Sequence, residues 1–236
     1  MPKNEPWKIE SFDEITSIDE TEAEVLASFK GNELDLNGLT CLSEDAAKAL
    51  ASFKGQYLFL NGLTSLKSGA AKALGSFKGC RLTLDGLTSL SIDSAKALAS
   101  FRGDSIDLSG LTKLSDELAK AIASFNVSYM LTLDGLKRLP KKPAKELAFF
   151  RGKRLSLSGI TDLSEGAGKA LALYKGDHLD LMGLTSLTDG AAKALASFKG
   201  EHLFLNHRVR LSKKGQKALA FFRTSMDAAC EAEGDE

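Results

Sequence analysis

Two histidines in equivalent sequence contexts could bind a metal ion or respond to pH. His178 and His202 lie 24 residues apart, the period of a repeat in this chain, each directly before a Leu-x-Leu segment, in "HLDL" and "HLFL". We therefore expect the two side chains to lie about 5 Å apart on neighbouring strands. With Asp180 beside them, two imidazoles could hold a transition metal, or the pair could titrate near neutral pH. The alternative is two exposed imidazoles without a special role. No third ligand, His207 included, stands at a metal-site spacing, so we expect no metal and no cofactor.

Basic side chains form the second candidate site. Between Lys137 and Arg154 there are eight bases and one acid, Glu146. We take six of these bases as a basic patch: Lys137, Arg138, Lys141, Lys142, Lys153 and Arg154. The patch could bind an acidic partner or the acidic C-terminal segment, or it could have no role. Lysines also recur along the chain, from Lys48 to Lys217, and such a row could follow a nucleic-acid backbone. Lysines near helix ends are equally explained by the helix dipole, so nucleic acid is the less favoured partner.

Aromatic residues are the third candidate. Tyr57 and Phe59, and later His202 and Phe204, place large rings where equivalent positions are mostly polar. Exposed aromatics are favoured anchors of protein interfaces, although they could instead cover a neighbouring strand. The chain contains no Gly-rich phosphate loop, no nucleophile elbow and no histidine pair with metal-protease spacing. We therefore expect a binding protein rather than an enzyme.

Composition agrees with a folded protein and excludes a strong global charge. The chain has 236 residues, is 43% hydrophobic, and has 31 basic and 31 acidic residues. The acids are concentrated at the ends, with net charges of −6 over residues 1–28 and −5 over 224–236. No apolar run is long enough to span a bilayer, and no secretory signal is seen. Three scattered cysteines, Cys41, Cys80 and Cys230, favour a reducing compartment, so we expect a cytoplasmic location.

A repeat positions all of these residues. Leu-x-Leu segments begin at Leu34 and recur every 24 residues until Leu203, with one step of 25 between Ile106 and Leu131. Each is followed by a helical pattern such as "DAAKALASFKG", which ends on an aromatic residue and usually a glycine. The alternation predicts eight strands of three residues, and the i, i+3, i+4, i+7 stripe predicts nine helices of about ten.

Local signals mark the ends of the predicted helices. Hydroxyl residues stand where N-caps are needed: Ser43, Ser91, Ser115, Ser164 and Thr188. Glycines stand after six of the helices, where we expect left-handed caps: Gly55, Gly79, Gly103, Gly152, Gly176 and Gly200. One unit is too small to bury a core alone, so the copies must stack with their strands in a parallel sheet.

The wording "LxLxGLTxLSxxAAKALASFKG" resembles a bacterial variety of the leucine-rich repeat family over roughly residues 12–223. The resemblance implies an α/β right-handed solenoid, with short parallel strands on the concave face and α-helices on the convex face. Leucine stands at most of the positions where that family carries asparagine, three residues after the second strand leucine, so we expect no asparagine ladder. We expect threonine hydroxyls to bond between turns instead: Thr40, Thr64, Thr88, Thr112, Thr161 and Thr185.

The resemblance also implies protein recognition through the concave face. Its candidate residues are Tyr57, Phe59, Arg81, Arg154, His178, Asp180, His202 and Phe204. We expect one solenoid domain: a cap and first helix over 1–30, an array over 31–206, a capping helix over 207–228 and a disordered acidic tail over 229–236. Trp7, Ile9, Phe12, Ile15 and Ile18 should cover the first unit. A structural scaffold and an anion binder remain as alternatives, and a monomer is assumed.

Overall fold

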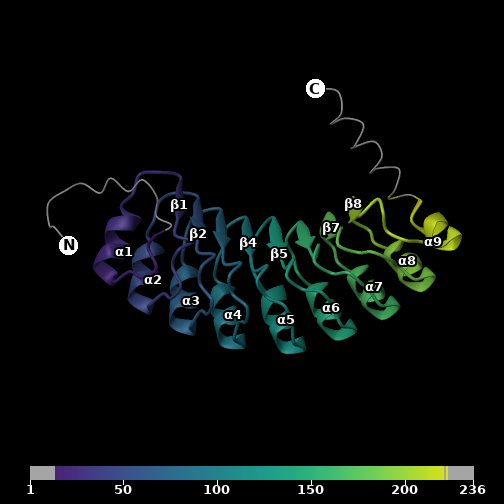
Figure 1. The fold of residues 1–236 in the computed structure, drawn as a ribbon, viewed down its shortest axis with the longest axis horizontal. Coiled ribbons are helices and arrows are strands. Elements are labelled where there is room, and N and C mark those ends of the chain that lie inside the picture. Colours follow the sequence, from purple (N-terminus) through teal and green to yellow (C-terminus); the bar gives the residue numbers. More distant parts are fainter. Residues whose placement is uncertain (1–13, 221, 223–236) are drawn as a thin grey trace, which may run out of the picture.

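The computed structural model describes residues 14–220 and 222, and shows one parallel sheet alternating with helices along a curved array (Figure 1). Eight strands pair in chain order. They are β1 Glu33–Asp35, β2 Tyr57–Phe59, β3 Arg81–Thr83, β4 Ser105–Asp107, β5 Met130–Thr132, β6 Arg154–Ser156, β7 His178–Leu181 and β8 His202–Leu205. The array is therefore an α/β repeat solenoid in which each repeat contributes one short strand, as predicted.

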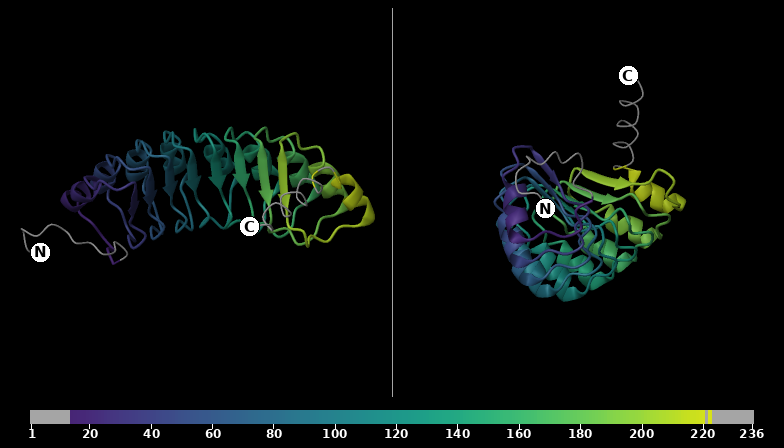
Figure 2. Two further views of the ribbon diagram at one scale, coloured as in Figure 1. Left: turned by 90° about the horizontal axis from the view of Figure 1, so that it is seen from above. Right: turned by 60° about the vertical axis from the view of Figure 1, so that its left-hand side comes forward.

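Helices cover the side of the array opposite the sheet. They are α1 Glu20–Ala27, α2 Glu44–Leu50, α3 Ser68–Leu74, α4 Ile92–Leu98, α5 Asp116–Ala123, α6 Lys141–Leu147, α7 Glu165–Leu171, α8 Asp189–Leu195 and α9 Lys213–Ala218. The strands line the inner side of the arc and the helices its outer side (Figures 1 and 2). Closely spaced strands and wider helices produce this curvature, because paired strands lie about 4.8 Å apart and packed helices about 8–10 Å.

The core is a single stack of equivalent side chains. Leucines of the strands, alanines of the helices and one ring per repeat are buried in one continuous cluster. The rings of Phe53, Phe77 and Phe101 lie parallel, with centroids 6.4 and 6.2 Å apart, and Phe150, Tyr174 and Phe198 continue the same column. Each repeat thus buries its apolar face against its neighbours, which is why a single copy could not fold alone.

The helices are shorter than predicted, six to eight residues rather than about ten. The chain leaves α2 after Leu50, and the N–H of Phe53 then bonds to the Leu50 carbonyl, three residues earlier. This tighter turn directs the ring into the core. The predicted serine and threonine N-caps are confirmed, since each side chain accepts a backbone N–H three residues ahead.

The glycines after the helices do not form left-handed caps, so that prediction is wrong. No residue of the described chain has positive φ. Gly55 is instead required because a Cβ there would lie 2.6 Å from the carbonyl oxygen of Asn32 in the preceding repeat. The same holds at the turn after β2, where a Cβ on Gly62 would lie 2.1 Å from the Asn37 carbonyl oxygen. Glycine allows the repeats to approach each other.

The predicted hydrogen bonds of threonine hydroxyls between neighbouring repeats are present at only two positions. The hydroxyls of Thr40 and Thr185 donate to the carbonyls of Thr16 and Thr161, each at 3.2 Å. The other four predicted threonines make no such side-chain bond, and all four are exposed: Thr64, Thr88, Thr112 and Thr161.

The expected absence of an asparagine ladder is also wrong. A ladder runs one residue after the second strand leucine: Asn37 Oδ1 accepts the N–H of Asn61 at 2.9 Å, and Asn61 Oδ1 that of Asp85 at 3.2 Å. Asp134 Oδ1 accepts from Ser158 N in the same way, at 2.8 Å. The bonding function exists at a different position of the repeat from the one the family motif uses.

The ends of the array are described only in part. Ile15 and Ile18 pack against the core, as predicted for the N-terminal cover, while Trp7, Ile9 and Phe12 lie outside the described residues. At the other end α9 closes the described stack. The predicted continuation of this helix through Met226 and the acidic tail over 229–236 also lie outside.

Candidate interaction surface

The strand register lines up equivalent concave side chains in columns. Each strand pairs with the next at an offset of one repeat, as in Asp180↔Phe204 on β7 and β8. One column consists of the residue between the two apolar residues of each Leu-x-Leu segment. It faces the inner side of the arc and differs from copy to copy: Asp35, Phe59, Thr83, Asp107, Thr132, Ser156, Asp180 and Phe204. Candidate concave residues far apart in sequence are therefore brought together only where their repeats are adjacent.

Five of the predicted residues meet on β6, β7 and β8. The rings of His178 and His202 stack with centroids 5.0 Å apart, which confirms the spacing expected for neighbouring strands. The Phe204 ring lies 6.0 Å from His178 and 5.7 Å from His202. The guanidinium carbon of Arg154 lies 5.0 Å from the Phe204 centroid, a cation–π arrangement. We call these four side chains together with Asp180 the imidazole–aromatic cluster.

The buried Asp180 side chain fixes the position of Arg154 in this cluster. Its carboxylate accepts from Arg154 Nη2 at 2.7 Å, from the Ser158 hydroxyl at 2.6 Å and from the N–H of Met182 at 3.1 Å. Asp180 is 5% exposed, so it positions Arg154 rather than presenting a charge to solvent. The sequence identified Asp180 as a site residue but not this pairing.

The surroundings of His178 disfavour its charged form. Nδ1 of His178 is buried without a hydrogen-bond partner. Burial, the neighbouring His202 and the Arg154 cation lower the pKa of His178, against the opposing carboxylates of Asp177 and Glu201. Within residues 14–220 and 222 no group of three or more His, Cys, Asp or Glu side chains is arranged to hold a metal ion.

A second aromatic feature lies on β2, six strands from β8. The rings of Tyr57 and Phe59 stack with centroids 6.4 Å apart, and both are half-buried. Tyr57 and Arg81 line a shallow groove of about 440 Å³ along the edge where the strands begin, together with Lys153. At about 4.8 Å per strand step, the two aromatic regions are about 29 Å apart along the sheet.

The surface between the two aromatic regions is acidic. Asp107 lies on β4, and Asp85 and Asp134 lie two residues after β3 and β5. None of the three is in an ion pair of the described chain, and they outnumber the exposed Arg81 of β3. Partial burial and the nearby Asp107 raise the pKa of Asp85. Two hydroxyls flanking Asp107 in the register, Thr83 Oγ1 and Thr132 Oγ1, are buried without partners.

The basic patch does not form one surface. Lys137, Arg138, Lys141 and Lys142 follow β5, at the edge where strands end, whereas Lys153 precedes β6 at the opposite edge. Arg154 belongs to the imidazole–aromatic cluster on the concave face. Lys142 lies 3.6 Å from Asp116, so part of the patch is balanced locally.

The recurring lysines lie on the helical face, and some are paired with acids of their own helix. Lys48 contacts Glu44 and Asp45, each at 2.9 Å, and Lys169 contacts Glu165. These pairs are exposed, and they support the view that the row is a solvated helix face.

Sequence reasoning missed two exposed apolar side chains, Phe149 and Leu173, which follow α6 and α7 and are each 66% exposed. The corresponding residue after α2, α3, α4, α5 and α8 is serine. A column-by-column comparison of the convex side, and not only of the strands, would have found them.

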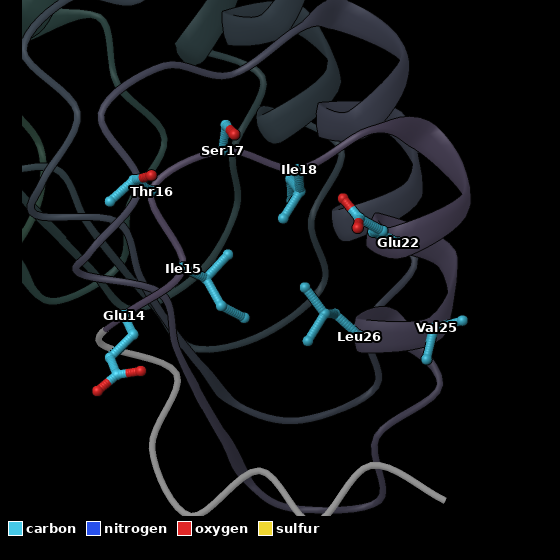
Figure 3. A pocket seen from close by; sticks show the side chains of 8 residues that line it. All are labelled: Glu14, Ile15, Thr16, Ser17, Ile18, Glu22, Val25 and Leu26. Atoms are coloured by element: carbon cyan, nitrogen blue, oxygen red, sulfur yellow. The ribbon is translucent and has the colours of Figure 1, made fainter. Parts of the chain in front are cut away.

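A small pocket opens at the N-terminal end of the described chain (Figure 3). It has a volume of about 250 Å³ and lies between residues 14–18 and α1. The side chains of Ile15, Ile18 and Leu26 face one another across it. These residues belong to the cover of the first repeat, so the pocket is part of the end of the stack.

Comparisons with known proteins do not assign the chain to a family: no family model matches it, and no curated protein matches it. Within the described residues, no helix combines the length and apolar character needed to cross a membrane.

Proposed function

We propose that the protein is a non-catalytic binding module that recognises another protein along its concave face. The observation that carries this proposal is the pair of half-exposed aromatic regions, Tyr57 with Phe59 and the imidazole–aromatic cluster, at the two ends of an otherwise polar surface. Large rings held rigidly by neighbours lose little entropy on binding and are common interface anchors. The resemblance to leucine-rich repeats supports the same function.

Charge on the concave face narrows the class of partner. Asp85, Asp107 and Asp134 lie between the aromatic regions and outnumber Arg81, while the nearby Arg154 is engaged with Asp180. A partner that spans this face should therefore carry apolar groups about 29 Å apart and basic side chains between them. A nucleic acid would meet repulsion on this surface.

The test is affinity purification from the organism that makes the protein, with three forms of the chain as bait. The concave variant replaces Tyr57, Phe59 and Phe204 by Ser, and a control variant replaces Ile92, an exposed apolar residue of α4, by Ser. We expect a protein that the wild type and the control retain, that the concave variant retains at least about tenfold less, and that binds more weakly as salt rises.

Equal retention by the concave variant would contradict the proposal, as would the absence of any protein above the bead background, which is the result expected of a structural scaffold. Retention of heparin or nucleic acid at low salt, dependent on Lys141 and Lys142, would instead support an anion binder. Circular dichroism of each variant verifies that the fold is intact.

A further inference from the structure

One position of the repeat has a defined structural role in most copies. After α1 to α8 it is the first or second residue beyond the helix, directly before the aromatic residue that ends the helical pattern, and its backbone N–H donates to the carbonyl three residues earlier. In five described repeats the residue is a serine whose hydroxyl donates to that same carbonyl, at 2.6 to 2.9 Å: Ser28, Ser76, Ser100, Ser124 and Ser197. Serine fits this position because it satisfies a carbonyl at the end of the helix.

Two adjacent repeats within residues 14–220 depart from this pattern in the same direction. Phe149 and Leu173 keep the backbone bond, to Glu146 and Ala170, but have no hydroxyl and extend apolar side chains into solvent. At 66% exposure they are the most exposed large hydrophobic residues of the described chain. Burial in the core cannot explain them, and exposed apolar groups that cluster are typical of interfaces.

A depression lies next to Phe149. It has a volume of about 510 Å³ and is lined by the ends of α5 and α6 and the residues that follow them, including Ala123, Phe125 and Ser124. α6 and α7 pack side by side, so Phe149 and Leu173 are separated by one helix spacing, about 8–10 Å. Phe149, beside the depression, and Leu173, one helix further along, can hold two side chains of one bound segment.

The charges around Phe149 and Leu173 indicate that the partner is acidic. Lys120 and Arg151 line the depression, and two further bases are exposed nearby, Lys145 on α6 and Lys175 four residues after α7. None of these four is in an ion pair of the described chain, and Glu146 is the one acid of the lining. A second copy of the chain docking symmetrically here would bring like charges together, whereas an acidic segment would be attracted.

We propose that Phe149 and Leu173 form a second docking surface, on the outer side of the array, for an acidic peptide segment that carries apolar side chains. This surface is separate from the concave face. The two can therefore be occupied by different partners, or by two parts of one partner.

The experiment selects ligands for this surface directly. Random 16-residue peptides displayed on phage are bound to the whole wild-type chain after depletion on the double variant Phe149→Ser, Leu173→Ser. This variant installs the residue that other repeats use, so its unfolding by urea should be at least as resistant as that of the wild type. Enriched peptides are then synthesised, and their dissociation constants are measured by fluorescence anisotropy.

We expect enriched peptides that are acidic and contain spaced apolar residues, bind the double variant at least about tenfold more weakly, and lose affinity as salt rises. Ile92→Ser removes another exposed apolar side chain, on α4, and should leave binding unchanged. The proposal is overturned if no peptide prefers the wild type, or if the preferring peptides are basic or neutral. It is also overturned if sedimentation shows a wild-type dimer that the double variant abolishes.

Discussion

At the scale of single residues, the candidate interaction residues stand out because the structural positions of the repeat are nearly the same in every copy. His178, His202 and Phe204 share one corner of the concave face with Arg154, whose charge Asp180 balances. The 24-residue spacing was enough to predict the contact between the two histidines. It could not predict that Arg154 reaches Asp180 across strands, because that depends on side-chain conformation rather than on register.

The environment of His178 predicts a measurable pH response. Burial and the adjacent His202 hold its pKa below the ordinary value of 6.5. Between that folded-state pKa and 6.5 the unfolded chain binds more protons than the folded chain. The free energy of unfolding should therefore fall as pH drops from about 6.5 to the folded-state pKa, and stay level below it with respect to this group.

NMR titration of the imidazole protons checks this directly, with a midpoint for His178 below 6.5. In His202→Gln the midpoint should move upward, because a neighbouring positive charge is removed. His207→Gln, which alters a histidine outside the cluster, is the matched control and should leave the midpoint in place. A midpoint at or above 6.5 would contradict the prediction.

At the scale of elements, each helix start is determined by a few atoms. Ser43 accepts the N–H of Ala46 and so caps α2, whereas Lys67 occupies the same backbone conformation before α3 without a side-chain bond. The sequence predicted the serine and threonine caps correctly, because the required chemistry is local. It failed at the glycines, because their reason is a contact with the preceding repeat that no local pattern contains.

Lys67 therefore offers a gain in stability. Lys67→Ser should raise the free energy of unfolding by about 0.5–1 kcal/mol, because the extended backbone at φ −73° and ψ 153° already suits a capping hydroxyl. Ser43→Ala, which removes the existing cap of α2, should lower the free energy of unfolding by about 1 kcal/mol. Urea denaturation of both variants measures the effects, and a Lys67→Ser protein no more stable than the wild type would show that the cap is not limiting.

At the scale of the whole molecule, the core is one continuous stack to which every described repeat contributes, so each repeat depends on its neighbours. The sheet keeps one register from β1 to β8, and adjacent helices pack in chain order. The repeat period alone predicted this arrangement. What covers the first and last repeats could not be predicted in the same way, because the end residues depart from the repeated pattern.

Removing one complete repeat should preserve the fold. Deletion of residues 60–83 joins Phe59 to Leu84 and restores the 24-residue spacing. We expect cooperative unfolding with an m-value lower by about a tenth, in proportion to the surface lost. Deletion of residues 60–71 is the control: it removes half a repeat, places a helical segment against a strand, and should abolish cooperative unfolding. If both deletions unfold alike, stacking in register is not what stabilises the chain.

The step of 25 residues shows where the array tolerates extra length. Strand pairing continues without a shift from Ile106 to Leu131, and the backbone bond of Tyr129 to the Asp104 carbonyl resumes the normal pattern. The additional residue is therefore absorbed between Phe125 and Tyr129, on the return path from helix to strand. That segment is a natural site for grafting a foreign epitope or a metal-binding tag. The insert would project from the edge where the strands begin, and the strands on either side would keep their register.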